Sequence, residues 1–218
     1  RELFHSCRLD EVVAAVAAAA RLLPGLPLGI AGFSLGGNFA LRVALRAPSA
    51  GIPLAYALAV CPAISPRDAM NAIEQAPWFY EAYFLRKWRR SLGLKQQAFP
   101  SEPLSDAKDL RGNLREMTRA LVLRHTSFAT LDDYFDGYSI AGDRLSAMQV
   151  PTSVLTSVDD PIIPVADFRQ LSLPACVELD IAPGGGHCGF IRDLSLTSWT
   201  EDYIADRMSR NLSSPVFP

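Results

Sequence analysis

Residues 32–36 have the sequence GFSLG and lie between an apolar run and an Ala-, Leu- and Val-rich segment. Glycines two positions before and two positions after a serine are typical of a sharp strand-to-helix turn, because larger side chains there would collide with the turn or its neighbours. Such a turn holds the serine in strained backbone angles and raises its hydroxyl above the sheet. The pattern predicts a strand over residues 28–33, a nucleophile at Ser34 and a helix that starts at Leu35.

The same turn predicts an oxyanion site. A helix that begins at Leu35 points its first N–H groups toward the carbonyl that Ser34 would attack, so the backbone N–H of Leu35 is the expected donor. The alternative is a glycine-rich turn of a dinucleotide-binding unit. That alternative is disfavoured because the spacing does not give G-x-G-x-x-G and no acidic residue follows a second nearby strand to hold a ribose.

Further apolar runs over residues 55–60, 152–158 and 176–181 alternate with helical segments over 10–23, from 35 up to Pro48, and 196–211. Apolar strands that alternate with helices predict an α/β fold, with a mostly parallel sheet covered by helices on both faces. The first run, 28–33, fits a strand buried on both faces.

The interval 66–148 breaks this rhythm and carries helical patterns, including residues 78–92 and 110–124, with a proline-containing connection around 99–104. We expect a helical lid insertion there, within a single domain that spans residues 1–218, rather than a second domain with its own core.

A serine hydroxyl needs a base, and the chain offers three histidines. His5 precedes the first helix and His125 ends a helix of the insertion, where a surface or packed histidine is the simpler interpretation. His187 lies in GGGHCGF directly after the last strand and is the preferred base. Asp159 and Asp160 end the preceding strand and form a turn with the proline that follows. An aspartate here gives the chain order Ser, Asp, His of the α/β-hydrolases.

Charge, hydropathy and cysteine usage limit the classes of function and the compartment that the sequence allows. The 21 Lys and Arg residues face 23 Asp and Glu residues, so a net charge of −2 argues against nucleic-acid binding. The longest strongly apolar run, residues 12–20, is too short to span a membrane. Four scattered cysteines predict unpaired thiols in a reducing compartment, and hence a cytoplasmic location, with a Cys176–Cys188 bridge as the alternative. We expect no metal and no organic cofactor, because a serine mechanism needs none.

Four stretches together resemble the YheT-like branch of the α/β-hydrolases: GFSLGGN, DDYFDGYS at 132–139, LSAMQVPTSVLTSVDDPIIP at 145–164 and GGGHCGF at 184–190. The resemblance extends from about residue 3 to about residue 205 and includes the insertion. It implies the α/β-hydrolase fold and an esterase or lipase-like activity, in some members on medium-chain or oxidised phospholipid acyl groups. It also implies a triad of Ser34, Asp160 and His187, since the acid of the family directly precedes the proline.

The chain departs from that family at its start. Members carry further strands before the helix that leads to the nucleophile, and a His-Gly-rich loop there supplies a second oxyanion donor. The resemblance therefore implies an N-terminally truncated fold with an unpaired apolar edge, and loss of one oxyanion donor lowers turnover by roughly 100- to 1,000-fold. The alternatives to a carboxylic ester hydrolase are a binding or scaffold protein of the same fold, or a fragment with no activity alone.

The lid carries two further expectations. The segment FLRKWRRSL, residues 84–92, is basic and amphipathic, which suits contact with an anionic lipid surface or a solvated helix above packed aromatic side chains. Trp78, Phe79, Tyr83 and Phe84 are the candidate walls of an acyl pocket for a small-molecule or lipid ester.

Overall fold

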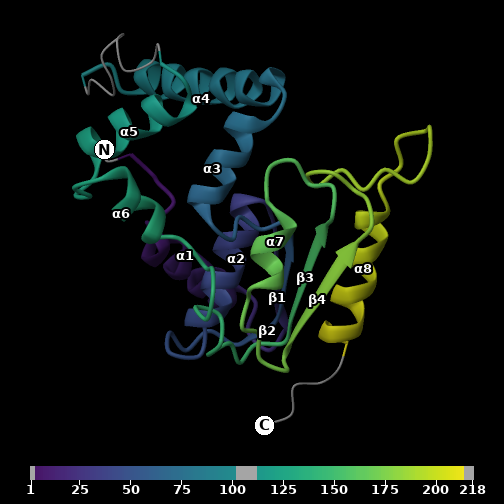
Figure 1. The fold of residues 1–218 in the computed structure, drawn as a ribbon. Helices are drawn as coiled ribbons and strands as arrows, with labels where there is room; N and C mark the ends of the chain where they lie inside the picture. The colour runs from purple at the N-terminus through teal and green to yellow at the C-terminus, as the bar shows by residue number, and fades with distance from the viewer. Residues whose placement is uncertain (1–2, 102–111, 214–218) are drawn as a thin grey trace.

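A computed structural model describes residues 3–101 and 112–213 and contains one sheet of four parallel strands in the order β1-β2-β3-β4 (Figure 1). The strands lie where the apolar runs predicted them: β1 (Leu28–Phe33), β2 (Leu54–Val60), β3 (Thr152–Ser157) and β4 (Val177–Ala182). Because all four strands are parallel, their carboxyl ends lie at one edge of the sheet. The residues that follow β1, β3 and β4 are therefore brought together.

Helices cover both faces of this sheet, as the fold class predicts (Figure 1). One face carries α1 (Leu9–Leu22), α2 (Leu35–Arg46) and α7 (Val165–Arg169), and the other carries α8 (Trp199–Leu212). Alternate residues of β2 pack on opposite faces of the sheet. Ala57 and Ala59 pack in the cluster that contains Leu41 of α2, whereas Leu58 packs in the cluster that α8 covers. The sheet is thus the centre of two apolar cores.

The first strand departs from the expectation of burial on both faces. Phe33 is 47% exposed and Ala31 is also exposed. The physical reason is position, because β1 lies at the edge of the sheet among the described residues and pairs only with β2 there.

Residues 65–139, which we call the helical arm, rise from the carboxyl end of the sheet (Figure 1). The arm contains α3 (Pro66–Gln75), α4 (Trp78–Ala98), α5 (Leu114–His125) and α6 (Leu131–Asp136). Helix α4 runs past the predicted end at residue 92, and α5 begins four residues after the predicted start at 110, which itself lies outside the described residues, as do 102–104 of the predicted connection. The arm leaves and returns at one point, where Ile140 N donates to Ile64 O at 2.9 Å.

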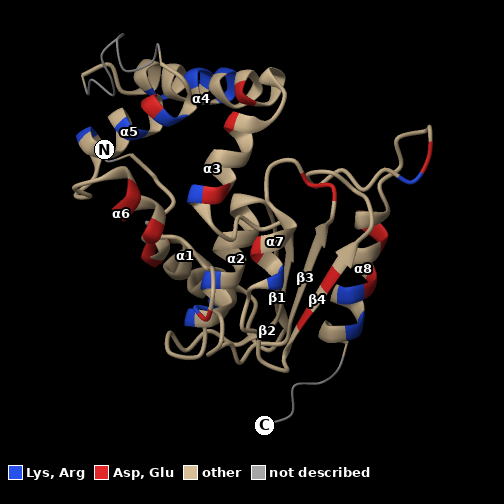
Figure 2. Ribbon diagram, in the orientation of Figure 1, with Lys and Arg blue, Asp and Glu red and all other residues tan. Residues whose placement is uncertain are grey.

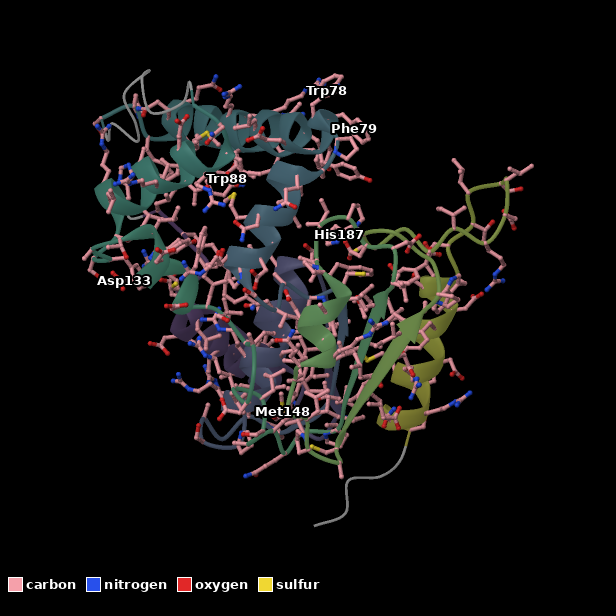
Figure 3. The ribbon with its side chains drawn as sticks, in the orientation of Figure 1. Trp78, Phe79, Trp88, Asp133, Met148 and His187 are labelled. Atoms are coloured by element: carbon pink, nitrogen blue, oxygen red, sulfur yellow. The ribbon has the colours of Figure 1, made fainter. Side chains whose placement is uncertain are left out.

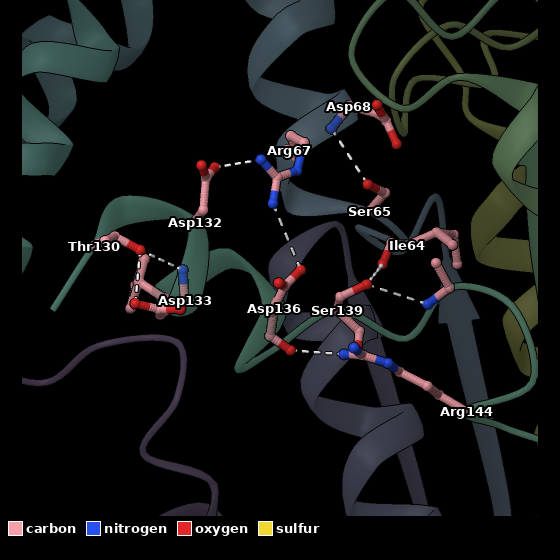
Figure 4. A network of polar contacts seen from close by, with 12 residues as sticks. Ile64, Ser65, Arg67, Asp68, Thr130, Asp132, Asp133, Asp136, Ser139 and Arg144 are labelled. Atoms are coloured by element: carbon pink, nitrogen blue, oxygen red, sulfur yellow. Dashed lines mark hydrogen bonds and ion pairs between the residues drawn. The ribbon is translucent and has the colours of Figure 1, made fainter. Parts of the chain in front are cut away.

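Local contacts define the helices of the arm and tie them together. The Ser65 side chain caps α3 by accepting from Asp68 N at 3.3 Å, and Asn113 and Glu116 form a capping box at the start of α5. Arg67 of α3 forms ion pairs with Asp132 and Asp136 of α6 (Figure 4). These pairs link α3 to α6 but are exposed, so each adds little to stability.

Candidate active site

Ser34 occupies the turn between β1 and α2. Its φ of 50° is unusual for a residue with a side chain, and it serves as the N-cap of α2. Backbone hydrogen bonds hold this conformation: Ser34 N donates to Val60 O at 2.9 Å, and Asn38 N donates to Ser34 O at 3.0 Å. The strained turn predicted from GFSLG is therefore present, with its serine at the carboxyl end of the sheet.

The two glycines of that turn are not equivalent, which corrects the expectation that both avoid a clash. A Cβ on Gly32 would lie 2.2 Å from Gly36 O, a distance that the backbone cannot accommodate. A Cβ on Gly36 would meet open space. The tight second position is Gly37, where a Cβ would lie 3.1 Å from both Gly32 O and the Pro62 Cβ. Gly32 and Gly37 are therefore the positions in this turn where the structure leaves too little room for a larger side chain.

His187 connects Ser34 to Asp160. Its Nε2 lies 2.9 Å from Ser34 Oγ, and its Nδ1 lies 2.9 Å from Asp160 Oδ2 and 3.2 Å from Oδ1. Figure 3 shows His187 at the upper end of the sheet, below α4. With the neutral ring, Nδ1–H donates to Asp160 and Nε2 accepts the serine proton. The structure thus brings the three sequence-predicted side chains into one chain of hydrogen bonds.

The adjacent aspartates 159 and 160 have different partners. The side chain of Asp160 is fully buried, and its Oδ1 accepts from Ile162 N at 2.8 Å and Ile163 N at 3.0 Å. Asp159 is exposed, and its Oδ1 accepts from Gly185 N at 2.8 Å and Gly186 N at 2.9 Å. Asp159 therefore anchors the loop that carries His187, a role that the sequence pattern did not reveal.

Charge around His187 changes its acidity. Burial lowers the pKa of His187, but hydrogen bonds to Asp160 and then Cys188 outweigh that effect and raise it to about 9. The pKa of Cys188 is lowered to about 6, first by its hydrogen bond with Cys61 and then, against the opposing effect of burial, by His187. Contact with Cys188 and burial raise the pKa of Cys61. Two thiols thus lie beside the imidazole.

The expected oxyanion donor lies at the start of α2. Leu35 is the first residue of this helix, where backbone N–H groups have no intrahelical acceptor. Leu35 also lines the pocket that opens beside Ser34. Its N–H is therefore available to a ligand oxygen at this position.

A mainly apolar pocket of about 160 Å³ joins Ser34 to the helical arm. Phe84 and Trp88, four residues apart on the inward face of α4, belong to its lining. Trp78, Phe79 and Tyr83 are outside the lining as the described residues define it, and Trp78 is 81% exposed. Figure 3 shows Trp78 and Phe79 at the start of α4, with Trp88 on the side toward the sheet. Of the four predicted wall residues, only Phe84 faces this pocket, and Trp88 was missed because the run of aromatics hides the helical period.

A larger cavity of about 810 Å³ lies at the opposite end of the sheet, beside the starts of β2 and β3. Its described lining contains no titratable side chain; its polar members are Gln149 and Ser213. This described lining offers no titratable group that could act on a substrate, so the smaller pocket beside Ser34 is the candidate active site.

The other candidate residues have structural surroundings. His5 packs against Phe128 and Tyr134, with ring centroids 6.3 Å and 5.9 Å away, and His125 ends α5. The four cysteines are all free, so the alternative of a Cys176–Cys188 bridge is wrong.

Helix α4 carries several basic residues (Figure 2). We call its outward side the one formed by the exposed residues Phe79, Tyr83, Arg86, Lys87 and Arg90. Leu94, further along the same helix, is also exposed. Among the described residues, no helix is long and apolar enough to cross a membrane.

A parallel sheet covered by helices, with a serine on the first strand-to-helix turn and an aspartate and a histidine after later strands, defines an α/β-hydrolase. The chain belongs to the family described as serine aminopeptidase, S33, whose sequence profile matches residues 6–191. The resemblance seen in the sequence is confirmed by this match and by the relatives that follow.

Two curated relatives share the name "Putative esterase". Slr0264 of Synechocystis sp. is 26% identical over 84% of this chain and 54% of its own length, and YheT of Escherichia coli is 28% identical over 86% and 56%. This chain thus spans about half the length of the curated relatives that it matches.

Solved structures share the fold at low sequence identity. An α/β-fold hydrolase from Bacillus anthracis matches with a TM-score of 0.55 and 16% identity, covering 91% of this chain and 73% of that one. The Pyrococcus furiosus esterase PF2001 matches with a TM-score of 0.52 and 13% identity, covering 94% of this chain and 62% of its own. These likenesses establish the architecture.

Proposed function

We propose that this α/β-hydrolase cleaves carboxylic esters through an acyl-enzyme, with Ser34 as nucleophile, His187 as base and Asp160 as the group that orients the base. The observation that carries the proposal is the continuous contact from Ser34 Oγ to His187 Nε2, at 2.9 Å, and from His187 Nδ1 to Asp160 Oδ2, at 2.9 Å. A hydroxyl, an imidazole and a buried carboxylate in that order form a proton relay.

The reaction has two balanced halves. Ser34 Oγ attacks the acyl carbon while His187 Nε2 takes its proton, and the N–H of Leu35 stabilises the oxyanion that forms. The ester bond then breaks, the alcohol leaves with the proton from His187, and the acyl group stays on Ser34. Water next attacks the acyl-enzyme, gives its proton to His187 and releases the acid, after which the proton returns to Ser34.

The pocket supports a short acyl group. Its volume of about 160 Å³ is below the roughly 300–1,000 Å³ usual for drug-sized ligands, and its walls include Met70, Ile73, Phe84 and Trp88. A series of aryl esters of increasing acyl length tests this proposal through kcat/KM. We expect a maximum at short acyl chains and a decline toward long ones; a rise up to palmitate would contradict it.

The serine mechanism is tested by covalent labelling with a fluorophosphonate. We expect labelling in the protein and in Ser49→Ala, a distant exposed serine variant, and none in Ser34→Ala. Turnover of an aryl ester should fall by at least about 1,000-fold in Ser34→Ala. Equal labelling of both variants would contradict the role of Ser34.

The second candidate is a protein of the same fold that binds a ligand without hydrolysis, or a piece of a longer enzyme that is inactive alone. The favouring observation is that the chain spans about half of its curated relatives, while one oxyanion donor, Leu35, is assigned. Tight binding of an ester or its acid, without a burst of released aryl alcohol, would support this candidate over the enzyme. A thioester or an amide is a variant substrate for the same relay.

We also propose that the outward side of α4 contacts anionic lipid, supported by the exposed Phe79 and Tyr83 beside Arg86 and Arg90. Co-sedimentation with vesicles of phosphatidylglycerol and phosphatidylcholine should exceed that with phosphatidylcholine alone. The double variant Arg86→Ser/Arg90→Ser should lose this difference, and Arg210→Ser on α8 should keep it; equal binding to both vesicles would exclude the contact. The free thiols support the cytoplasm as the proposed location.

A further inference from the structure

A cluster of sulfur and nitrogen atoms lies behind the proposed proton relay. Cys61 follows β2 and Cys188 follows His187, and one ligand atom from each of these three residues lies within 4.8 Å of the other two. Cys61 is fully buried, whereas Cys188 and His187 are partly buried. Both thiols are free.

The cluster is supported by the backbone on both sides. Cys188 Sγ lies 3.8 Å from Val60 O, the carbonyl before Cys61, and Cys61 Sγ lies 3.9 Å from Gly186 O, the carbonyl before His187. The two segments therefore lie side by side, although they are far apart in the sequence. Neither thiol forms or breaks a bond to substrate in the proposed hydrolysis, so the cluster needs its own explanation.

Two thiols and one imidazole form a ligand set suited to Zn²⁺. Zinc binds sulfur at about 2.3 Å and imidazole nitrogen at about 2.0–2.1 Å, so ligand atoms around a tetrahedral ion are about 3.5–3.8 Å apart. The ligand atoms of the cluster are up to 4.8 Å apart. Side-chain movements of about 1 Å would bring them into the range that zinc requires. Hard cations that prefer oxygen, such as Ca²⁺ and Mg²⁺, do not match these ligands.

We propose that Cys61, Cys188 and His187 bind one Zn²⁺ ion, and that this binding reversibly blocks the active site. Coordination needs two thiolates and a neutral imidazole, so any proton that the two sulfurs or the coordinating nitrogen carry is released to solvent as the metal binds. The blocking effect rests on the proposed function, whereas the metal site itself does not.

Blocking follows from the contacts of the imidazole. Its Nδ1 is engaged with Asp160 and its Nε2 with Ser34. Coordination through either nitrogen removes one of these two contacts, so the ring can no longer both hold its orientation and accept the serine proton. Whichever nitrogen binds, the relay is interrupted.

Direct binding is measured first, in Ser34→Ala, which retains all three ligands and has no nucleophile. Isothermal titration calorimetry with ZnCl₂, in a phosphine reductant that keeps the thiols reduced, should show one ion per chain. Affinity should fall at least tenfold when Cys61→Ser or Cys188→Ser is added and stay unchanged with Cys176→Ser, a matched thiol outside the cluster. Circular dichroism confirms that each variant is folded. Co²⁺ provides a second readout, through a thiolate charge-transfer band that both cluster variants should lose.

Inhibition is measured second, with an aryl ester and the unsubstituted chain. Zn²⁺ should suppress hydrolysis, EDTA should restore it, and Cys188→Ser should need at least tenfold more Zn²⁺ for the same effect. Absence of binding to Ser34→Ala, affinity unchanged in both cluster variants, or bound zinc without loss of hydrolysis would overturn the proposal. A chain that binds zinc through the cluster but cleaves no ester would contradict the proposed function and leave the metal site standing.

Discussion

The two neighbouring carboxylates that follow β3, Asp159 and Asp160, contact different parts of the His187 loop. Asp160 is buried against His187, while Asp159 accepts from the backbone of the loop that carries His187. Hydrogen bonds, led by that of the Gly186 N–H, hold the pKa of Asp159 below its ordinary value. One residue therefore orients the imidazole and the other positions its loop.

Substitution of each aspartate by asparagine separates these roles. Asn at position 160 keeps an oxygen for Ile162 N and Ile163 N but turns an amide N–H₂ toward His187, which favours the wrong tautomer. We expect kcat for an aryl ester to fall by about 10³- to 10⁴-fold in Asp160→Asn. Asp159→Asn keeps a neutral acceptor for Gly185 and Gly186, so its loss should stay within about tenfold. Similar losses in the two variants would contradict this division of roles.

The raised pKa of His187 predicts a pH dependence. The relay needs a neutral imidazole, so kcat/KM should rise with pH toward a plateau above the His187 pKa of about 9. Cys188 helps to raise that pKa, so Cys188→Ala should move the rise to lower pH, toward the ordinary value near 6.5. Cys176→Ala is the matched control and should leave the profile in place. Profiles recorded in EDTA exclude metal effects; a shift of the Cys188→Ala profile to higher pH would contradict the assignment.

At the scale of elements, the turn from β1 to α2 offers a comparison within five residues. Gly32→Ala should destabilise the fold by about 3 kcal/mol or more, because its Cβ would meet the Gly36 carbonyl. Gly36→Ala, in the first turn of α2 with open space at its Cβ, should leave stability unchanged or raise it by about 0.5–1 kcal/mol. Urea unfolding followed by circular dichroism measures both. Equal destabilisation would show that the turn geometry described here is wrong.

The strands and the turn at Ser34 could be predicted from the sequence because each depends on residues that are neighbours in the chain. Apolar runs predict the strands, and GFSLG predicts the turn of Ser34 from residues within one stretch of chain. The contact of Cys61 with Cys188 depends on how the loop after β4 folds over the sheet, which no local pattern records. The inward position of Trp88 depends in the same way on the rotation of α4 against its neighbours.

At the scale of the whole molecule, the two edges of the sheet differ in charge. The edge strand β4 carries Glu178 and Asp180, which pair with Arg207 of α8. The other edge strand, β1, contains only apolar residues and glycine, with Ala31 and Phe33 exposed. Charged side chains protect an edge against pairing with another chain, and β1 lacks this protection.

We therefore expect the 218-residue chain to self-associate through β1. Ala31→Lys should shift the sedimentation profile in analytical ultracentrifugation toward the monomer, because a charge on an edge strand opposes strand pairing. Ala50→Lys adds the same charge in an exposed turn and should leave the profile unchanged. A monomeric unsubstituted chain, or equal effects of the two variants, would contradict the expectation.

The backbone hydrogen bond between Ile64 and Ile140, at the base of the helical arm, has an evolutionary consequence. Everything between these two residues departs and returns at adjacent points, so insertions, deletions or exchange of that segment need not disturb strand register. Ser34, Asp160 and His187 all lie outside it. If the proposed function holds, substrate preference can therefore diversify by replacement of this segment while the proposed triad is inherited intact.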